Sequence, residues 1–274
     1  MITSEAVDMT RQPTPARGSL HWNLNRIFFL ASARLATSEK VTMTLALPEG
    51  RSAQPGVTAQ QVLRVYAAGM DATQTLHWND TDVEVHKVVV GPYENNVFVV
   101  RCRHSGEAVL LDAANEHELL LDLARSLGVR TILETHGHWD HIQAIPQVRD
   151  AGFEVGVTAA DAEMLPSYDY ILEDDSMIEF GTQKLHTAIT PGHTPGSICF
   201  KLVGKPLLFT GDTLFPGGPG ATAKTGSDFN TIIDSIDTRL FTYDPDTIVL
   251  PGHGDNTTIG AERPSLQEWV DRGW

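Results

Sequence analysis

The segment Thr135-His136-Gly137-His138-Trp139-Asp140-His141 places three histidines and one aspartate within seven residues. Imidazole and carboxylate side chains together suit zinc, iron or manganese, and no thiolate occurs in this segment. His136 and His138 are two residues apart, so both can point to one side of an extended loop and chelate one ion. Asp140 and His141 fall at the expected start of the next helix and face a neighbouring position. The segment therefore predicts part of a metal site.

Three further polar clusters begin, like the first, where a short apolar run ends. They are PGHTPG at 191–196, GDT at 211–213 and PGHG at 251–254. Rigid strands that end in ligand-bearing loops bring donors from distant parts of a sequence to one point. Glycines beside the ligands permit tight turns. The four clusters supply seven candidate metal ligands: His136, His138, Asp140, His141, His193, Asp212 and His253.

The number of donors indicates more than one ion. Seven donors exceed the four that a tetrahedral ion uses, whereas two ions that share a carboxylate can use them all. We therefore predict two divalent metal ions, with zinc favoured and iron or manganese as alternatives. Asp212 is the natural bridge between them. The competing interpretation, a set of capping and core histidines, does not explain why each cluster follows an apolar run.

From residue 82 onward, short β-rich runs alternate with helical patterns. Strands are expected at 83–90, 97–103, 108–111, 131–133, 154–157, 184–189, 198–202, 206–209 and 247–250. Helices are expected at 142–149 and 229–240, and between a capping-box pattern at Asn115 and Glu118 and a stop at Gly128. This alternation predicts an α/β protein with sheets covered by helices.

The first part of the chain lacks this regularity. Residues 1–81 contain scattered small and polar residues, with one helical candidate at 58–70. We predict an N-terminal extension over 1–81, weakly structured or partly helical, and a catalytic domain over 82–274. Met70 offers an alternative start codon, a hypothesis that mass spectrometry of the native N-terminus would test.

Charge and cysteine content narrow the partners and the compartment. Among 274 residues, Asp and Glu number 35 and Lys and Arg 20, a net charge of -15. Such a surface repels phosphate backbones and anionic lipids, so we expect a small-molecule substrate, with no nucleic-acid or membrane partner. No apolar run approaches the roughly 20 residues needed to span a bilayer. Since only Cys102 and Cys199 occur, without C-x-x-C pairing, we expect reduced thiols and a cytoplasmic protein. The sequence does not indicate the oligomeric state.

Four motifs carry a resemblance to a known family. THGHWDH (135–141), PGHTPGS (191–197), FTGDTLF (209–215) and PGHG (251–254) resemble, in order and spacing, those of the metallo-β-lactamase superfamily, and within it the glyoxalase II-like hydrolases. The resemblance spans 82–274 and implies a four-layer αβ/βα sandwich with metals at one edge of its two sheets. It implies one ion on His136, His138 and His193, a second on Asp140, His141 and His253, and Asp212 bridging both.

Other residues match the family pattern around these motifs. Asp112, which closes the expected strand 108–111, matches a buried acidic group beneath the family's metal site. A simple strand-end cap is the alternative interpretation of Asp112. Asn95 and Asn96 also match the pattern, but we assign them no role.

The resemblance implies a dinuclear hydrolase that cleaves a thioester or a related ester-like bond. Two cations about 3.5–4 Å apart lower the pKa of a bridging water toward about 7, and the resulting hydroxide attacks the carbonyl. Asp140 is the candidate catalytic residue, since its carboxylate would orient that water or take its proton; a purely ligating role is the alternative. The loop 216–228 is expected to line the pocket, with Lys224 as an anion contact.

Two departures from the family limit this interpretation. Asp212 stands where class B β-lactamases of the best-known type carry cysteine, so we do not expect β-lactam hydrolysis. The segment 214–222 lacks the cysteine- and arginine-containing sequence typical of glutathione-thioester hydrolases, and the chain ends soon after His253, without room for their C-terminal helical domain. Glutathione recognition is therefore not implied. The alternatives are a mononuclear iron persulfide dioxygenase, a lactonase, and a non-enzymatic binding module or metal store. Metal analysis and turnover of persulfides, lactones and thioesters distinguish them.

Overall fold

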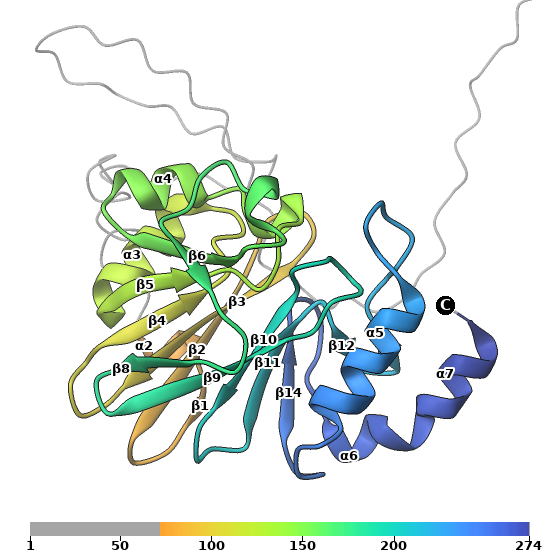
Figure 1. The fold of residues 1–274 in the computed structure, drawn as a ribbon. Coiled ribbons are helices and arrows are strands. Elements are labelled where there is room, and N and C mark those ends of the chain that lie inside the picture. Colours follow the sequence, from red (N-terminus) through yellow and green to blue (C-terminus); the bar gives the residue numbers. More distant parts are fainter. Residues whose placement is uncertain (1–71, 274) are drawn as a thin grey trace, which may run out of the picture. The chain divides into compact units, whose positions relative to one another are not determined.

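Two β-sheets packed face to face, with helices on both outer sides, form the part of the chain that the structure describes, residues 72–273 of a computed structural model (Figure 1). The first sheet has seven strands in sequence order, of which the first four pair antiparallel and the later ones parallel. They are β1 (Leu76–Asn79), β2 (Val83–Val90), β3 (Asn95–Cys102), β4 (Ala108–Leu111), β5 (Val129–Leu133), β6 (Glu154–Thr158) and β7 (Tyr170–Leu172).

The second sheet has six strands in the order β15-β14-β11-β10-β9-β8, and only β11 and β14 pair parallel. A separate two-stranded pair, β12 with β13, follows β11. The bounds are β8 (Met177–Phe180), β9 (Gln183–Ile189), β10 (Ile198–Leu202), β11 (Leu207–Gly211), β12 (Leu214–Phe215), β13 (Gly218–Pro219), β14 (Ile248–Pro251) and β15 (Thr257–Thr258).

Apolar residues on both faces of the central strands build this layered structure. Along β3, Val97 and Val99 pack against the first layer of helices, whereas Phe98 and Val100 pack into the core between the sheets. Successive side chains of a strand point to opposite faces, so an uninterrupted apolar run is buried on both sides. In β10, Cys199 points to the second helical layer while its neighbours enter the central core.

Helices cover the outer face of each sheet (Figure 1). On the first sheet, α3 (His117–Leu127) and α4 (Ile145–Asp150) bury apolar side chains against β2 to β6. On the second lie α5 (Phe229–Ser235), continued by a π-helical turn (Ile236–Leu240), α6 (Ile259–Glu262) and α7 (Leu266–Arg272). A short helix, α2 (Ala72–Thr75), precedes β1. This arrangement confirms the predicted α/β class and the four-layer αβ/βα sandwich.

The expected capping box at the start of α3 is wrong. The helix begins at His117, and no side-chain hydrogen bond caps it. Asn115 Nδ2 instead donates to Gln143 Oε1 (2.8 Å), so a tertiary contact takes the side chain that the local pattern assigned to the helix. The predicted stop is confirmed, because Gly128 follows the last helical residue in the left-handed conformation.

The N-terminal boundary of the sheets lies ahead of residue 82. β1 pairs with β2 and therefore belongs to the first sheet, although none of its four residues is buried. The helical candidate at 58–70 lies outside the described residues. Among residues 72–273, no helix combines the length and the apolar character needed to cross a bilayer.

Candidate metal centre

The seven candidate ligands lie in segments that follow four strands. Segment 135–141 follows β5, His193 follows β9, Asp212 follows β11 and His253 follows β14. Backbone hydrogen bonds join these segments: Ile198 N donates to Thr135 O (2.9 Å), and Gly252 N donates to Gly211 O (2.8 Å). The first of these bonds links the two sheets, so ligands far apart in sequence meet where the sheets meet.

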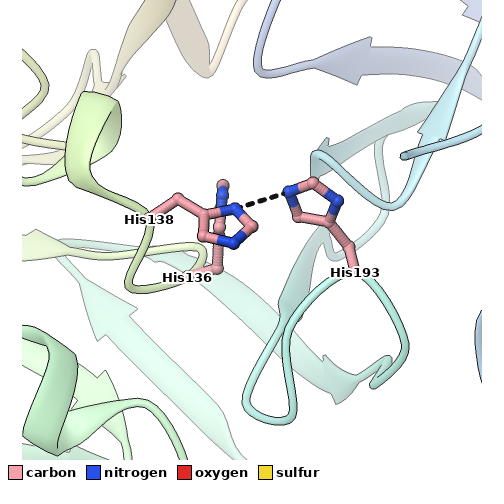
Figure 2. A group of neighbouring side chains, drawn as sticks. All are labelled: His136, His138 and His193. Carbon is pink, nitrogen blue, oxygen red and sulfur yellow. Dashed lines mark hydrogen bonds between the residues drawn. The ribbon is translucent and has the colours of Figure 1, made fainter. Parts of the chain in front are cut away.

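Three overlapping groups of the candidate ligands have donor atoms within 4.8 Å of one another. Figure 2 shows the first group, in which His136 and His138 face His193 across the site, with His138 Nδ1 and His193 Nε2 2.8 Å apart. The groups share members, so all seven predicted ligands form one cluster. The other two groups are His136-His141-Asp212 and Asp140-His141-His253.

Hydrogen bonds to residues outside the ligand set orient four of the five histidine rings, and so determine which ring nitrogen faces the cluster. The Nδ1 atoms of three rings donate to oxygen atoms at 2.8–2.9 Å: His141 to Asp112 Oδ2, His193 to Ala221 O, and His253 to Tyr93 O. In the fourth ring, His136 Nδ1 lies 3.0 Å from Thr135 Oγ1. Nε2 is therefore the nitrogen that each of these four rings turns toward the cluster, the position from which a histidine binds a metal.

Two buried polar atoms of the cluster indicate whether the site suits metal ions. Within the described residues, His136 Nε2 and Asp212 Oδ1 have no hydrogen-bond partner. An unpaired buried polar atom costs about 1–3 kcal/mol, which coordination of a cation would offset. Gly252 makes the close approach possible, because a Cβ there would overlap Asp212 Oδ1 and lie 2.8 Å from His141 Cε1. The residues present fit divalent metal ions.

Burial keeps the first histidine group neutral. It lowers the pKa of His136 well below the usual value and that of His138 to about 4, and neighbouring histidines add to both shifts. Burial also lowers the pKa of His193. A histidine must be unprotonated to bind a metal, so these three rings are ready for ligation at neutral pH.

His141 and His253, in contrast, favour the positively charged, protonated form. Burial acts to lower the pKa of His141, but the carboxylates of Asp212 and Asp112 outweigh it and raise that pKa well above the usual value. Burial also acts to lower the pKa of His253, but the hydrogen bond to Asp140, the charge of Asp212 and the hydrogen bond to Tyr93 together raise it. The carboxylates thus stabilise a cation at this position, and a divalent metal would replace the protons.

Residues beneath and beside the cluster hold the ligands in place. Asp112 is buried and accepts hydrogen bonds from His141 and from Thr135 N (2.6 Å), so it does more than cap a strand end. Asn95 Nδ2 donates to Asp140 Oδ2 (3.1 Å). Asn96 Nδ2 donates to carbonyl oxygens on both sides of His253, those of Pro251 (2.9 Å) and Gly254 (3.0 Å).

Two buried acids near the centre were not predicted from the sequence. Glu134 accepts a hydrogen bond from Ala113 N (3.1 Å), and burial together with the neighbouring Asp112 raises its pKa well above the usual value. Asp161 contacts both loops of the first histidine group. Glu134 follows β5 and Asp161 follows β6. A polar residue shortly after a strand was the feature of the sequence that could have identified both acids.

Aromatic side chains and a lysine lie around the centre. Trp139 is 61% exposed and Tyr93 58%, and their rings form an edge-to-face pair with centroids 5.9 Å apart. Lys224 lies near enough for its charge to contribute to the lowered pKa values of His138 and His193. The loop 216–228 therefore brings a cation close to the first histidine group, where an anion contact was predicted.

Comparison with known proteins relates these motifs to a family. The family model of the metallo-beta-lactamase superfamily matches residues 90–253. The hydroxyacylglutathione hydrolase GloC of Haemophilus influenzae is 35% identical over 183 residues, which cover 58% of this chain and 85% of GloC.

Two solved structures share the fold and a related sequence. TTHA1623, crystallised in a di-iron-bound form, is 30% identical with a TM-score of 0.58, over 65% of this chain and 96% of that one. ETHE1 from Myxococcus xanthus is 25% identical with a TM-score of 0.58, over 65% of this chain and 81% of that one. Because the matched residues 90–253 include every member of the clustered ligand set and most of both sheets, this chain belongs to the metallo-beta-lactamase superfamily.

Proposed function

We propose that this chain is a dinuclear metal-dependent hydrolase that cleaves a thioester or a related ester-like bond. One observation carries the proposal: five histidines and two carboxylates converge in three overlapping groups with donor atoms within 4.8 Å. His136, His138 and His193 would hold one ion, and Asp140, His141 and His253 the second. Asp212 would bridge them, since its carboxylate oxygens lie 3.5–3.6 Å from Nε2 of His141, His193 and His253.

The metal ions, when bound, would supply a Lewis acid and a water acidic enough to attack a carbonyl near neutral pH. Asp140 then has a specific part in the reaction. Burial acts to raise the pKa of Asp140, but the hydrogen bond with His253 and the charge of His141 lower it overall. With metal ions bound, Asp140 would orient the attacking water by accepting its hydrogen bond, or would take its proton; a purely ligating role is the alternative. Asn95 holds that carboxylate in position.

The ligand set supports zinc first, with iron or manganese as alternatives, because imidazole and carboxylate suit all three metals. The di-iron form of TTHA1623 keeps iron in consideration. The likeness to GloC supports a thioester as the bond cleaved. When a thioester is cleaved, the thiolate leaves without much assistance from an acid. The proposal therefore assigns no side chain of the cluster as a general acid.

A second candidate is a mononuclear iron persulfide dioxygenase, the class of ETHE1, to which this chain is 25% identical. A lactonase is a closer variant of the first proposal. The count of seven ligands favours the hydrolase, because a single ion cannot use them all.

Metal analysis combined with a substrate panel tests the proposal. The purified chain, reconstituted with zinc, iron or manganese, should hold two ions and hydrolyse lactoylglutathione or another thioester. The panel should include an acyl-homoserine lactone, a β-lactam and glutathione persulfide, the last with an oxygen electrode. One iron per chain with oxygen uptake would replace the hydrolase by the dioxygenase, and Asp212→Ala with normal metal content and turnover would refute the dinuclear site.

We also propose a cytoplasmic location and a small-molecule substrate, with no nucleic-acid or membrane partner. Both cysteines, Cys102 and Cys199, are buried free thiols, which suits a reducing compartment. Cell fractionation tests the location, and light scattering would determine the oligomeric state.

A further inference from the structure

A buried aspartate outside the ligand set joins the two loops that carry the first histidine group. Asp161 follows β6 and is 0% exposed. Its Oδ2 accepts hydrogen bonds from Gly137 N (2.8 Å) and Thr194 Oγ1 (2.7 Å), and its Oδ1 accepts one from Gly196 N (2.7 Å). Gly137 lies between His136 and His138 in the chain, and Thr194 follows His193 directly. One carboxylate therefore holds both loops.

The surrounding packing leaves this carboxylate little freedom. A Cβ at Gly196 would overlap Thr158 Oγ1 and lie 2.6 Å from Asp161 Oδ1. Thr158 Oγ1 in turn donates to Gly196 O (2.7 Å), so the second loop is fixed on both sides of its backbone. A Cβ at Gly137 would lie 2.6 Å from that of Met164, in the short turn that follows Asp161. Glycine at both positions lets the two loops approach the acid closely.

The chemistry of the three donors explains why a carboxylate is needed. Two of them are backbone N–H groups, which cannot reorient, and an ionised carboxylate offers only acceptors. Hydrogen bonds to a carboxylate are shorter and stronger than those between neutral groups. Outer partners of this kind typically change metal affinity 10- to 100-fold when they are lost. Asp112 is a comparable buried carboxylate, which accepts a hydrogen bond directly from the ligand His141 (2.8 Å).

We infer that Asp161 is a positioning residue for the first metal site. By fixing the spacing between the loops of His138 and His193, it sets the affinity of the site formed by His136, His138 and His193. Within residues 72–273, the Asp161 carboxylate accepts hydrogen bonds from Gly137, Thr194 and Gly196 and from none of Asp140, His141 and His253, so the second site should keep its affinity without it. This inference rests on the proposed dinuclear function.

The test is a metal titration of the metal-free chain with cobalt(II), whose visible absorption reports each site. His193→Ala identifies the binding step of the first site, and His253→Ala that of the second. Asp161→Asn keeps the shape of the side chain but turns an amide donor toward a backbone donor. It should weaken the step that His193→Ala removes by about 10- to 100-fold and leave the other step within about twofold. Thr194→Val, which removes one of the three donors, should weaken the same step by less.

Additional measurements separate positioning from a loss of folding. In the Asp161→Asn variant, excess metal should restore kcat, and thermal unfolding of the metal-free chain should show whether the fold is intact. An unchanged first step, or equal weakening of both steps, would overturn the inference. If Asp161→Asn does not fold, Thr194→Val decides the matter, and an unchanged first step in that variant overturns it. Absence of metal uptake by the unsubstituted chain would remove the proposed function as well, whereas normal uptake with an unaffected Asp161→Asn variant removes this inference alone.

Discussion

His141 Nδ1 lies 2.8 Å from Asp112 Oδ2, and both side chains are buried beneath the metal centre. The same carboxylate accepts hydrogen bonds from Thr135 N (2.6 Å) and Thr135 Oγ1 (2.8 Å). Asp112 has a φ of 66°, in the left-handed region that aspartate tolerates better than most residues. A single strand-end acid therefore fixes the ring of one ligand and the start of the loop that carries four of them.

Replacing this acid should weaken metal binding. In Asp112→Asn, one carboxylate oxygen becomes an amide nitrogen and can no longer accept the bonds that it received. We expect metal affinity or turnover to fall about 10- to 100-fold, measured by chelator competition and steady-state kinetics. Asp169→Asn is the matched control, because Asp169 pairs with Arg149 away from the cluster. Equal losses in the two variants would contradict the role of Asp112.

A methyl group at position 252 should disturb the centre itself. Its Cβ would overlap Asp212 Oδ1 and lie 2.8 Å from His141 Cε1, so Gly252→Ala should displace a ligand and lower the metal affinity at least about tenfold. Elemental analysis after dialysis against a chelator checks this. At Gly152, where a Cβ meets nothing within 4 Å, Gly152→Ala should cost stability through its φ of 92° but leave metal content intact. Full metal content in Gly252→Ala would refute the prediction.

Lys224 should contribute to binding of anionic substrates. Its charge reaches His138 and His193, so Lys224→Ala should raise KM about tenfold for a negatively charged thioester and change kcat little. The effect should shrink as salt is added, and KM for a neutral lactone should stay the same. Lys184→Ala, which removes a lysine paired with Glu179, serves as the control. An unaltered KM for every active substrate would remove Lys224 from the site.

Lys205 should make stability depend on pH in the acidic range. The Nζ atom of Lys205 contacts Asp80 (2.5 Å) and Asp82 (2.7 Å). The hydrogen bond from Lys205 and, to a smaller extent, the one from His104 lower the pKa of Asp82 to about 2. Because this folded-state pKa lies below the unfolded value of about 3.9, the ion pair stabilises the fold above pH ~4 and the contribution is lost as pH falls toward ~2.

Thermal unfolding of Lys205→Met checks that window. Its Tm should lie about 1–3 °C below that of the unsubstituted chain at pH 5, and the difference should vanish near pH 2. Lys205→Arg keeps the charge and should retain most of the stability. A gap in Tm that persists at pH 2 would assign the effect to packing of the lysine stem rather than to its charge.

The apolar runs of the central strands could be predicted from sequence because burial decides them. The expected ranges 83–90, 108–111 and 198–202 coincide with β2, β4 and β10. Four of the strands that were not predicted, β1, β7, β8 and β15, lie at the edges of the sheets and are partly exposed. The other two, β12 and β13, have two residues each and pair with one another. Backbone pairing with a neighbour holds such strands, and this pairing does not require the run of buried apolar side chains that marks a central strand in the sequence.

The sequence by itself determined the types of ligand at the metal centre, because only imidazole and carboxylate groups recur after apolar strands in this pattern. Tertiary structure decided which ring nitrogen each anchored histidine presents, since the acceptors that orient these rings come from other segments, such as Tyr93 O for His253. It also decided that Asp161 lies between two ligand loops, with donors from residues 137, 194 and 196. Hydrogen bonds between residues far apart in the chain depend on how the two sheets pack, and no local pattern encodes that packing.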